Sequence, residues 1–195
     1  MDHRAAKAYI LARIKDELPA KRTYHSLAHT LDVYAAAIDI GEREGVTGED
    51  MVLLTTAALF HDSGFILQDL EHEEASCRLA REHLPRWGFS PHQVERICAM
   101  IMATRIPQTP HDKLSRILCD ADLDYLGRDD FFSIGDTLFE ELRAYGVIAT
   151  EREWNAIQDR FISNHQYHTR TNKELREARK QEHLLEVRRR LGPVP

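Results

Sequence analysis

The sequence predicts an all-α fold, and three observations carry this prediction. Apolar residues recur at helical spacing along most of the chain, several helix-start signals are present, and no run alternates apolar and polar residues as a half-buried strand would. With 195 residues, 43% of them hydrophobic and 30% charged, the chain has the composition of a globular protein. No linker or repeat divides it, so we expect one compact helical domain over residues 1–195.

The first part of the chain contains three predicted helices. The first has apolar residues at i, i+3 and i+4 spacing and ends before Pro19. The second runs from 26 to 44 and stops at Gly45. The third, about 49 to 62, is apolar nearly all round, so we expect it to be buried at the centre of the fold.

Start signals mark the later helices. Ser90-Pro91-His92-Gln93 combines an N-cap, an N1 proline and an N3 glutamine, and Thr150-Glu151-Arg152-Glu153 is a capping box. The remaining helices are expected near 71–84, 91–103, 112–124, 129–145, 151–163 and 171–191. Charged residues dominate the last of these, which is typical of a solvated face. The helices after residue 129 are expected to pack on the motif-bearing part of the chain, about 24–126.

Charge and composition exclude several function classes. There are 26 Lys and Arg against 32 Asp and Glu, a net charge of -6, so no chain-wide basic surface favours nucleic acid or anionic lipid. No apolar run reaches the ~18 residues of a membrane span, and the first residues lack the apolar stretch of a signal peptide, so we expect a cytoplasmic protein. Cys77, Cys98 and Cys119 contain no C-x-x-C pair, which predicts core residues rather than disulfides or a zinc knuckle. The oligomeric state is left open.

Histidine is the unusual residue type, with eleven copies, several of them near acids. His25 and His29 are four residues apart, so in a helix both imidazoles face one side. His61 and Asp62 lie together at the end of the buried third helix. Burying such a pair alone is costly, whereas a divalent cation bound by both offsets the cost.

A third group of polar residues follows another apolar stretch. Among Asp120, Asp122 and Asp124 we expect Asp122 to point inward, and the other two to cap a helix or meet solvent. Two imidazoles and two carboxylates suit a borderline or hard divalent metal in octahedral geometry. Each group also has a structural interpretation: ordinary core or surface histidines, an internal His–Asp hydrogen bond, and helix capping.

These residues carry a resemblance to a known family. A histidine, then an adjacent His-Asp pair, then a distant Asp on an all-α chain is similar to the HD-domain superfamily of metal-dependent phosphohydrolases. The resemblance spans about residues 24 to 126. It implies that His29, His61, Asp62 and Asp122 hold one divalent ion, either Mn, Mg, Co, Ni, Fe or Zn.

Parts of the motif resemble different branches of that superfamily. Tyr24-His25 with His29, Asp32 and Val33 is similar to class I cyclic-nucleotide phosphodiesterases, which implies that His25 protonates the leaving oxygen. The segment 120–127 looks more like a bacterial group of predicted HD phosphohydrolases. Further residues that those phosphodiesterases have after His-Asp are not found here, so cyclic-nucleotide specificity does not carry over. Phe65 stands where some HD nucleotidases have a glutamate, so the base must come from elsewhere.

The resemblance predicts hydrolysis of a small phosphomonoester or phosphodiester, with a nucleotide as the expected substrate. A bound divalent ion supplies an activated water and polarises a phosphoryl oxygen. Asp62 is the leading candidate for the base, with His72 or Glu73 as alternatives. Arg105 and Lys180 are candidates for binding the phosphate.

Two other functions remain open at this stage. A diiron oxygenase on the same scaffold would need His72 and a further histidine, from His83, His92 or His111, to hold a second iron. A non-catalytic module that binds a nucleotide or a structural metal ion for regulation would keep the ligands without turnover.

Overall fold

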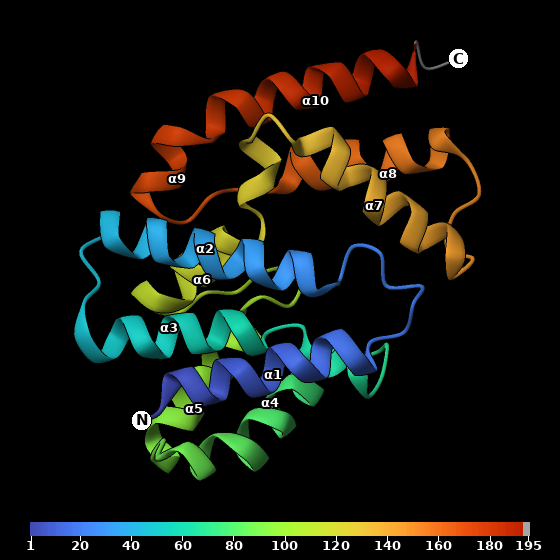
Figure 1. The fold of residues 1–195 in the computed structure, drawn as a ribbon. Helices are drawn as coiled ribbons and strands as arrows, with labels where there is room; N and C mark the ends of the chain where they lie inside the picture. The colour runs from blue at the N-terminus through green and yellow to red at the C-terminus, as the bar shows by residue number, and fades with distance from the viewer. Residues whose placement is uncertain (193–195) are drawn as a thin grey trace.

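The computed structural model describes residues 1–192. Over this range the chain forms ten α-helices and three short 3-10 helices with no strand, which confirms the all-α prediction (Figure 1). The α-helices are α1 (His3–Glu17), α2 (Leu27–Arg43), α3 (Gly48–Phe60), α4 (His72–His83), α5 (Pro91–Ala103), α6 (Lys113–Asp122), α7 (Phe131–Ala144), α8 (Glu151–Asn164), α9 (Arg170–Leu175) and α10 (Glu177–Leu191). The 3-10 helices are η1 (Ser63–Ile66), η2 (Leu84–Trp87) and η3 (Asp124–Gly127).

The predicted start signals form real caps. Ser90 accepts a hydrogen bond from the backbone of Gln93, whose side chain returns one to the Ser90 backbone. Thr150 and Glu153 make the same reciprocal pair at the start of α8. These caps satisfy backbone N–H groups that a helix end otherwise leaves without partners.

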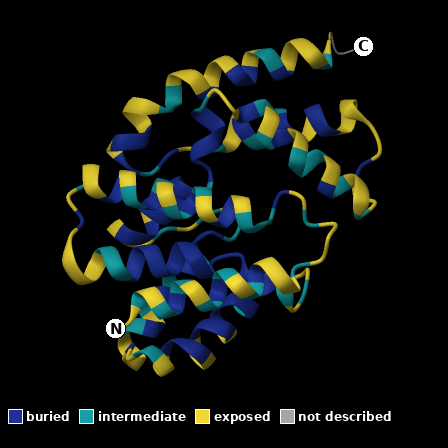
Figure 2. Ribbon diagram, in the orientation of Figure 1, coloured by how far each residue is buried: buried dark blue, intermediate teal, exposed yellow. Residues whose placement is uncertain are grey.

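The first hydrophobic core is built around α3. Every residue of this helix from Leu53 to Phe60 is buried, and α3 packs against α1, α2, α5 and α6. In Figure 2, α3 is yellow and teal in its first turn and dark blue beyond it, between helices whose outer faces are largely yellow. The prediction of a central buried helix is therefore confirmed. Cys77, Cys98 and Cys119 are buried free thiols, as expected of core residues.

A second core joins the C-terminal helices. Phe131 of α7, Ile162 of α8 and Val187 of α10 pack together, with Tyr24 and Leu123 contributed by the first part of the chain. In Figure 1 these C-terminal helices lie along α2 and α6, on the side away from α4 and α5. The segments that precede α2 and follow α6 therefore lie where the two cores meet.

Several helix boundaries differ from the sequence predictions, and three of the differences concern the candidate ligands or the C-terminal helices. α3 ends at Phe60, so His61 and Asp62 form a turn rather than the last turn of the helix. α6 ends at Asp122. The expected helix over 171–191 is two helices that meet at Arg176.

A tertiary contact explains the break at Arg176. A side chain at Gly127 would collide with the Arg176 backbone, so η3 approaches this point closely. The Arg176 guanidinium donates to Asp124 over 2.8 and 3.1 Å. The spacing of apolar residues along the sequence cannot predict these long-range contacts.

None of the described helices combines the length and apolar character needed to cross a membrane.

Candidate metal centre and adjoining cavity

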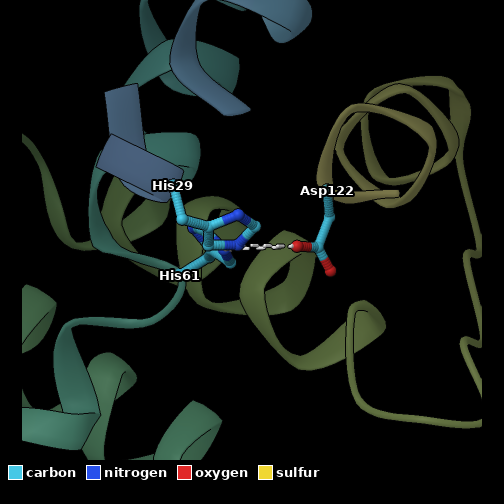
Figure 3. A group of neighbouring side chains, drawn as sticks. All are labelled: His29, His61 and Asp122. Atoms are coloured by element: carbon cyan, nitrogen blue, oxygen red, sulfur yellow. Dashed lines mark hydrogen bonds and ion pairs between the residues drawn. The ribbon is translucent and has the colours of Figure 1, made fainter. Parts of the chain in front are cut away.

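Three elements bring the candidate ligands together (Figure 3). His29 lies in the first turn of α2, His61 directly follows α3, and Asp122 is the last residue of α6. Since α2 packs on both α3 and α6, burial of their apolar faces fixes the relative positions of these three residues. The turn after α3 adds Asp62.

Two imidazole nitrogens and two carboxylates converge at this point. His29 Nε2 lies 3.3 Å from Asp62 Oδ2 and 3.2 Å from Asp122 Oδ1. His61 Nε2 lies 3.2 Å from Asp62 Oδ2 and 3.4 Å from Asp122 Oδ1. The ligand atoms of His29, His61 and Asp122 all lie within 4.8 Å of one another. Asp62 lies close to both imidazoles, but it is not one of the three residues whose ligand atoms satisfy this limit.

This donor set fits a divalent cation. Metal–nitrogen and metal–oxygen bonds of about 2.0–2.2 Å place neighbouring ligand atoms about 3 Å apart, close to the separations seen here. The two imidazole Nε2 atoms face each other at 3.3 Å. His61 Nδ1 lies 2.8 Å from the carbonyl oxygen of Ala58, and donation to that carbonyl leaves Nε2 as the metal-binding nitrogen.

Burial and the neighbouring charges shift the pKa values of these side chains in opposite directions. Burial alone would lower the pKa of His29, but hydrogen bonds to Asp122 and Asp62 outweigh it and raise the pKa to about 9. Burial would raise the pKa of Asp122, yet its bonds to His29 and His61 lower the pKa to about 2. The pKa of Asp62 is likewise held well below its usual range, despite burial, by His61 and His29. Both carboxylates are therefore ionised at neutral pH.

His25 lies just before α2, so it does not share a helix with His29 as their spacing of four residues suggested. It precedes α2, whose N-cap is Ser26, yet its ring centroid is only 6.1 Å from that of His29. Its Nδ1 lies 2.5 Å from Glu141 Oε1 of α7. Glu141 Oε2 also accepts from the backbone N–H of Tyr24 and of His25. The same carboxylate therefore positions both the backbone and the ring of His25.

His72 approaches Oδ1 of Asp62, whereas His29 and His61 approach Oδ2. As the first residue of α4, it stacks on Phe65 with ring centroids 3.9 Å apart. Its Nε2 is 3.3 Å from Asp62 Oδ1 and 3.6 Å from Glu73 Oε1. His83, His92 and His111, the other histidines considered for a second iron, do not line the cavity beside His72.

The two cations suggested for phosphate binding are engaged elsewhere. Lys180 is only 1% exposed, and its ammonium donates to the carbonyl oxygen of His165 and pairs with Glu177. Lys180 does not line the cavity beside the candidate ligands, so the structure does not place it at the site. Arg105 pairs with Glu73 and Glu74 at 3.4 and 3.2 Å, and it does not itself line the cavity, although Glu73 does.

Asp120 and Asp124, on either side of Asp122, stabilise the fold through hydrogen bonds and ion pairs, and both are buried. Asp120 is fully buried and accepts hydrogen bonds from the backbone N–H groups of His168 and Thr169, where α9 begins. Asp124 is 3% exposed and pairs with Arg176. We expected these two aspartates to cap a helix or to meet solvent. Asp120 does accept backbone N–H groups at the start of α9, but contact with solvent is wrong for both, because α9 and α10 cover this end of α6 and the sequence pattern does not show that contact.

A cavity of about 240 Å³ opens beside the candidate ligands. His25, Asp62, His72 and Asp122 lie along its wall, which continues between η3, α7 and α8. The remaining wall is mostly aromatic and aliphatic, and among the described residues no Lys or Arg lines it.

Sequence reasoning missed the contribution of α7 and α8. Glu141 positions His25 from 116 residues away, and Trp154, Gln158 and Phe161 line the cavity. One signal was available for the α8 residues, because their spacing of four and three places them on one face of a helix. No local signal connects Glu141 to His25.

Comparisons with known proteins agree with this arrangement. The family model described as HD domain matches residues 26–124, just over half of the chain. A comparison with curated protein sequences returns no significant match.

Two solved structures share the fold. A predicted HD superfamily hydrolase from an uncultured Thermotogales bacterium is 24% identical, with a TM-score of 0.63 over 96% of this chain and 90% of that one. Bacillus subtilis YpgQ, solved in complex with ADP, is 20% identical, with a TM-score of 0.66 over 100% of this chain and 98% of that one. The family match covers every candidate metal ligand from His29 to Asp122. The chain belongs to the HD domain family.

Proposed function

We propose that this protein is a metal-dependent phosphohydrolase that acts on a phosphomonoester or phosphodiester, with a nucleotide as substrate. One observation carries the proposal: two imidazoles and two carboxylates converge beside a cavity into which a further histidine, His25, also faces. The two structural neighbours add support, since one is described as a hydrolase and the other holds ADP.

The four candidate ligands supply the charge that a divalent ion requires. His29, His61, Asp62 and Asp122 would hold the ion, which in such sites lowers the pKa of a water molecule and polarises a phosphoryl oxygen. Asp62 has one oxygen toward the imidazoles and the other 3.3 Å from His72 Nε2. It is therefore placed to accept a proton from the attacking water and to share it with His72.

His25 is placed to protonate the leaving group. Its Nδ1–H donates to the buried Glu141 carboxylate, which orients the ring and stabilises a positive charge on it. The other ring nitrogen, Nε2, is then the atom that gives its proton to the departing alkoxide. This step matters most for substrates whose leaving alkoxide is strongly basic.

A metal screen tests the proposal. Protein stripped with a chelator is assayed with Mn, Mg, Co, Ni and Fe against 4-nitrophenyl phosphate, bis(4-nitrophenyl) phosphate and a nucleotide panel. The wild type should regain activity with at least one ion, and His61→Ala should lose both bound metal and turnover because it removes a buried ligand. His92→Ala, an exposed histidine at the start of α5, is the matched control and should behave as wild type. Metal binding without turnover on every substrate would instead favour a binding module.

His25→Ala separates proton transfer from metal binding. The variant should keep its metal and lose rate mainly on esters of alkyl alcohols. A nitrophenolate leaving group needs little protonation, so 4-nitrophenyl phosphate should be affected least. An equal loss on both kinds of ester would rule out His25 as the acid.

A further inference from the structure

Arg22 contacts groups that surround His25, although it does not line the cavity. Its Nη1 donates to Glu141 Oε1 over 2.6 Å, and its Nη2 donates to Asp69 Oδ1 over 2.5 Å. The Arg22 side chain is only 8% exposed, and a charge so far removed from water is stable only when it is paired. Arg22 therefore joins α7 to the segment between η1 and α4.

Two aromatic rings enclose the same guanidinium. Its central carbon lies 4.0 Å from the ring centroid of Phe65 and 4.3 Å from that of Tyr145, which follows α7. Flat cations favour such aromatic faces. His72 also stacks on Phe65, at 3.9 Å, and two groups cannot occupy one face of a ring. Phe65 is therefore held between Arg22 on one face and His72 on the other.

The same carboxylate and the same ring hold His25. Its Nδ1 lies 2.5 Å from Glu141 Oε1, the oxygen that also accepts from Arg22. An ionised carboxylate only accepts hydrogen bonds, so Nδ1 carries the hydrogen of this bond. The centroid of the His25 ring lies 4.5 Å from that of Phe65. Arg22 thus contacts both groups that fix the orientation of the His25 ring.

No other described residue takes the place of Arg22 in these contacts. Among the described residues, its guanidinium is the only permanently charged partner of Glu141, whose remaining donors are His25 and two backbone N–H groups. Loss of the guanidinium would leave the carboxylate free to turn and would open a gap beside Phe65. Both changes release the His25 ring, and a displacement of about 1 Å in a reacting group costs on the order of 100-fold in rate.

We infer that Arg22 is a positioning residue, which holds the ring of His25 in place for proton transfer through Glu141 on one side and Phe65 on the other. This inference rests on the proposed function for the role of His25 as the acid. The position of the ring itself can be observed without turnover.

The leaving group of the substrate distinguishes positioning from a general structural role. Arg22→Met keeps the approximate length of the side chain and removes its charge and hydrogen bonds. The assay compares a nitrophenyl ester with an alkyl ester of the same kind, monoester or diester, chosen from the metal screen. We expect a loss of about 100-fold on the alkyl ester and of less than about threefold on the nitrophenyl ester, with bound metal unchanged.

Arg13→Met is the matched control. Arg13 also pairs with a carboxylate, that of Glu17, and lies over an aromatic ring, that of Tyr9, but none of these three residues lines the cavity. This variant should hydrolyse both esters as the wild type does. If Arg22→Met does not fold, Arg22→Lys replaces it. A lysine keeps the charge but cannot bridge two carboxylates and lie flat on a ring, so the loss should be smaller and equally selective.

Nuclear magnetic resonance of protein labelled with ¹⁵N-histidine gives a second test, which is independent of turnover. In the wild type, the Nδ1–H of His25 should give a cross peak that exchanges slowly with water, because the hydrogen lies in a bond to a buried carboxylate. Its absence from His25→Ala identifies it. The cross peak should be lost from Arg22→Met and retained in Arg13→Met.

The two tests also separate this inference from the proposed function. An equal loss on both esters, or no loss on either, overturns the role of Arg22 and leaves the phosphohydrolase standing. If the wild type hydrolyses no phosphate ester with any metal, the proposed function is wrong. The cross peak then decides alone: its loss from Arg22→Met supports the positioning of His25 by Arg22, and its retention overturns it.

Discussion

Replacement of Glu141 by glutamine should impair both stability and the positioning of His25. The carboxylate is 1% exposed and accepts four hydrogen bonds. Oε2 takes those of the Tyr24 and His25 backbone N–H groups, and Oε1 takes those of His25 Nδ1 and Arg22 Nη1. A glutamine has one accepting oxygen, so in either orientation its NH2 group faces donors and one pair of these bonds is lost.

The size of the effect follows from two independent considerations. Despite burial, bonds to His25 and Arg22 lower the pKa of Glu141 from 4.5 to about 2, which corresponds to about 3 kcal/mol of stability at neutral pH. Removing one partner of a buried ion pair costs 3–5 kcal/mol in other proteins, about the same amount. We therefore expect Glu141→Gln to lower the free energy of unfolding by about 3 kcal/mol at pH 7.

The pH dependence provides the control. Because the folded pKa is lowered, the contribution is complete above pH 4.5 and is lost as the pH falls from there toward 2. Urea unfolding of wild type and variant at several pH values should give a difference that shrinks with acidity. A difference below about 0.5 kcal/mol at pH 7, the size of an ordinary surface substitution, would refute this role for Glu141.

Two further predictions concern the second core and the metal. Asp124→Asn should lower the free energy of unfolding by about 3 kcal/mol, because it leaves the Arg176 guanidinium without its buried carboxylate partner; an unchanged midpoint in urea would contradict this. Chelator treatment of metal-loaded protein should lower Tm, since an ion present at 100 times its Kd stabilises the folded state by about 2.7 kcal/mol, and His61→Ala should show no such shift.

Helix positions were largely predictable because the relevant signals are local. Apolar spacing and the caps at Ser90 and Thr150 identify where helices begin, and the structure confirms both caps. The expected helix over 171–191 failed at Arg176 for a different reason. Its break depends on η3, about 50 residues earlier in the chain, and helical propensity contains no information about that contact.

The candidate site also contains residues that the sequence indicates and residues that only long-range packing brings to the site. His29, His61 and Asp122 could be chosen from the sequence because they match the ligand pattern of the HD-domain superfamily, and because His61 and Asp122 each follow an apolar helical stretch. Gln158 and Glu141 could not, since isolated polar residues on amphipathic helices are usually solvated. Only the tertiary packing of α7 and α8 places Gln158 in the cavity wall and Glu141 against His25.

The position of a bound metal ion can be observed in crystals grown with Mn²⁺. We predict one anomalous peak at the manganese edge, about 2.2 Å from His29 Nε2, His61 Nε2 and oxygens of Asp62 and Asp122. A peak at another location, or no peak at these four side chains in crystals of protein that is active with Mn²⁺, would contradict the assignment of this cluster as the metal centre.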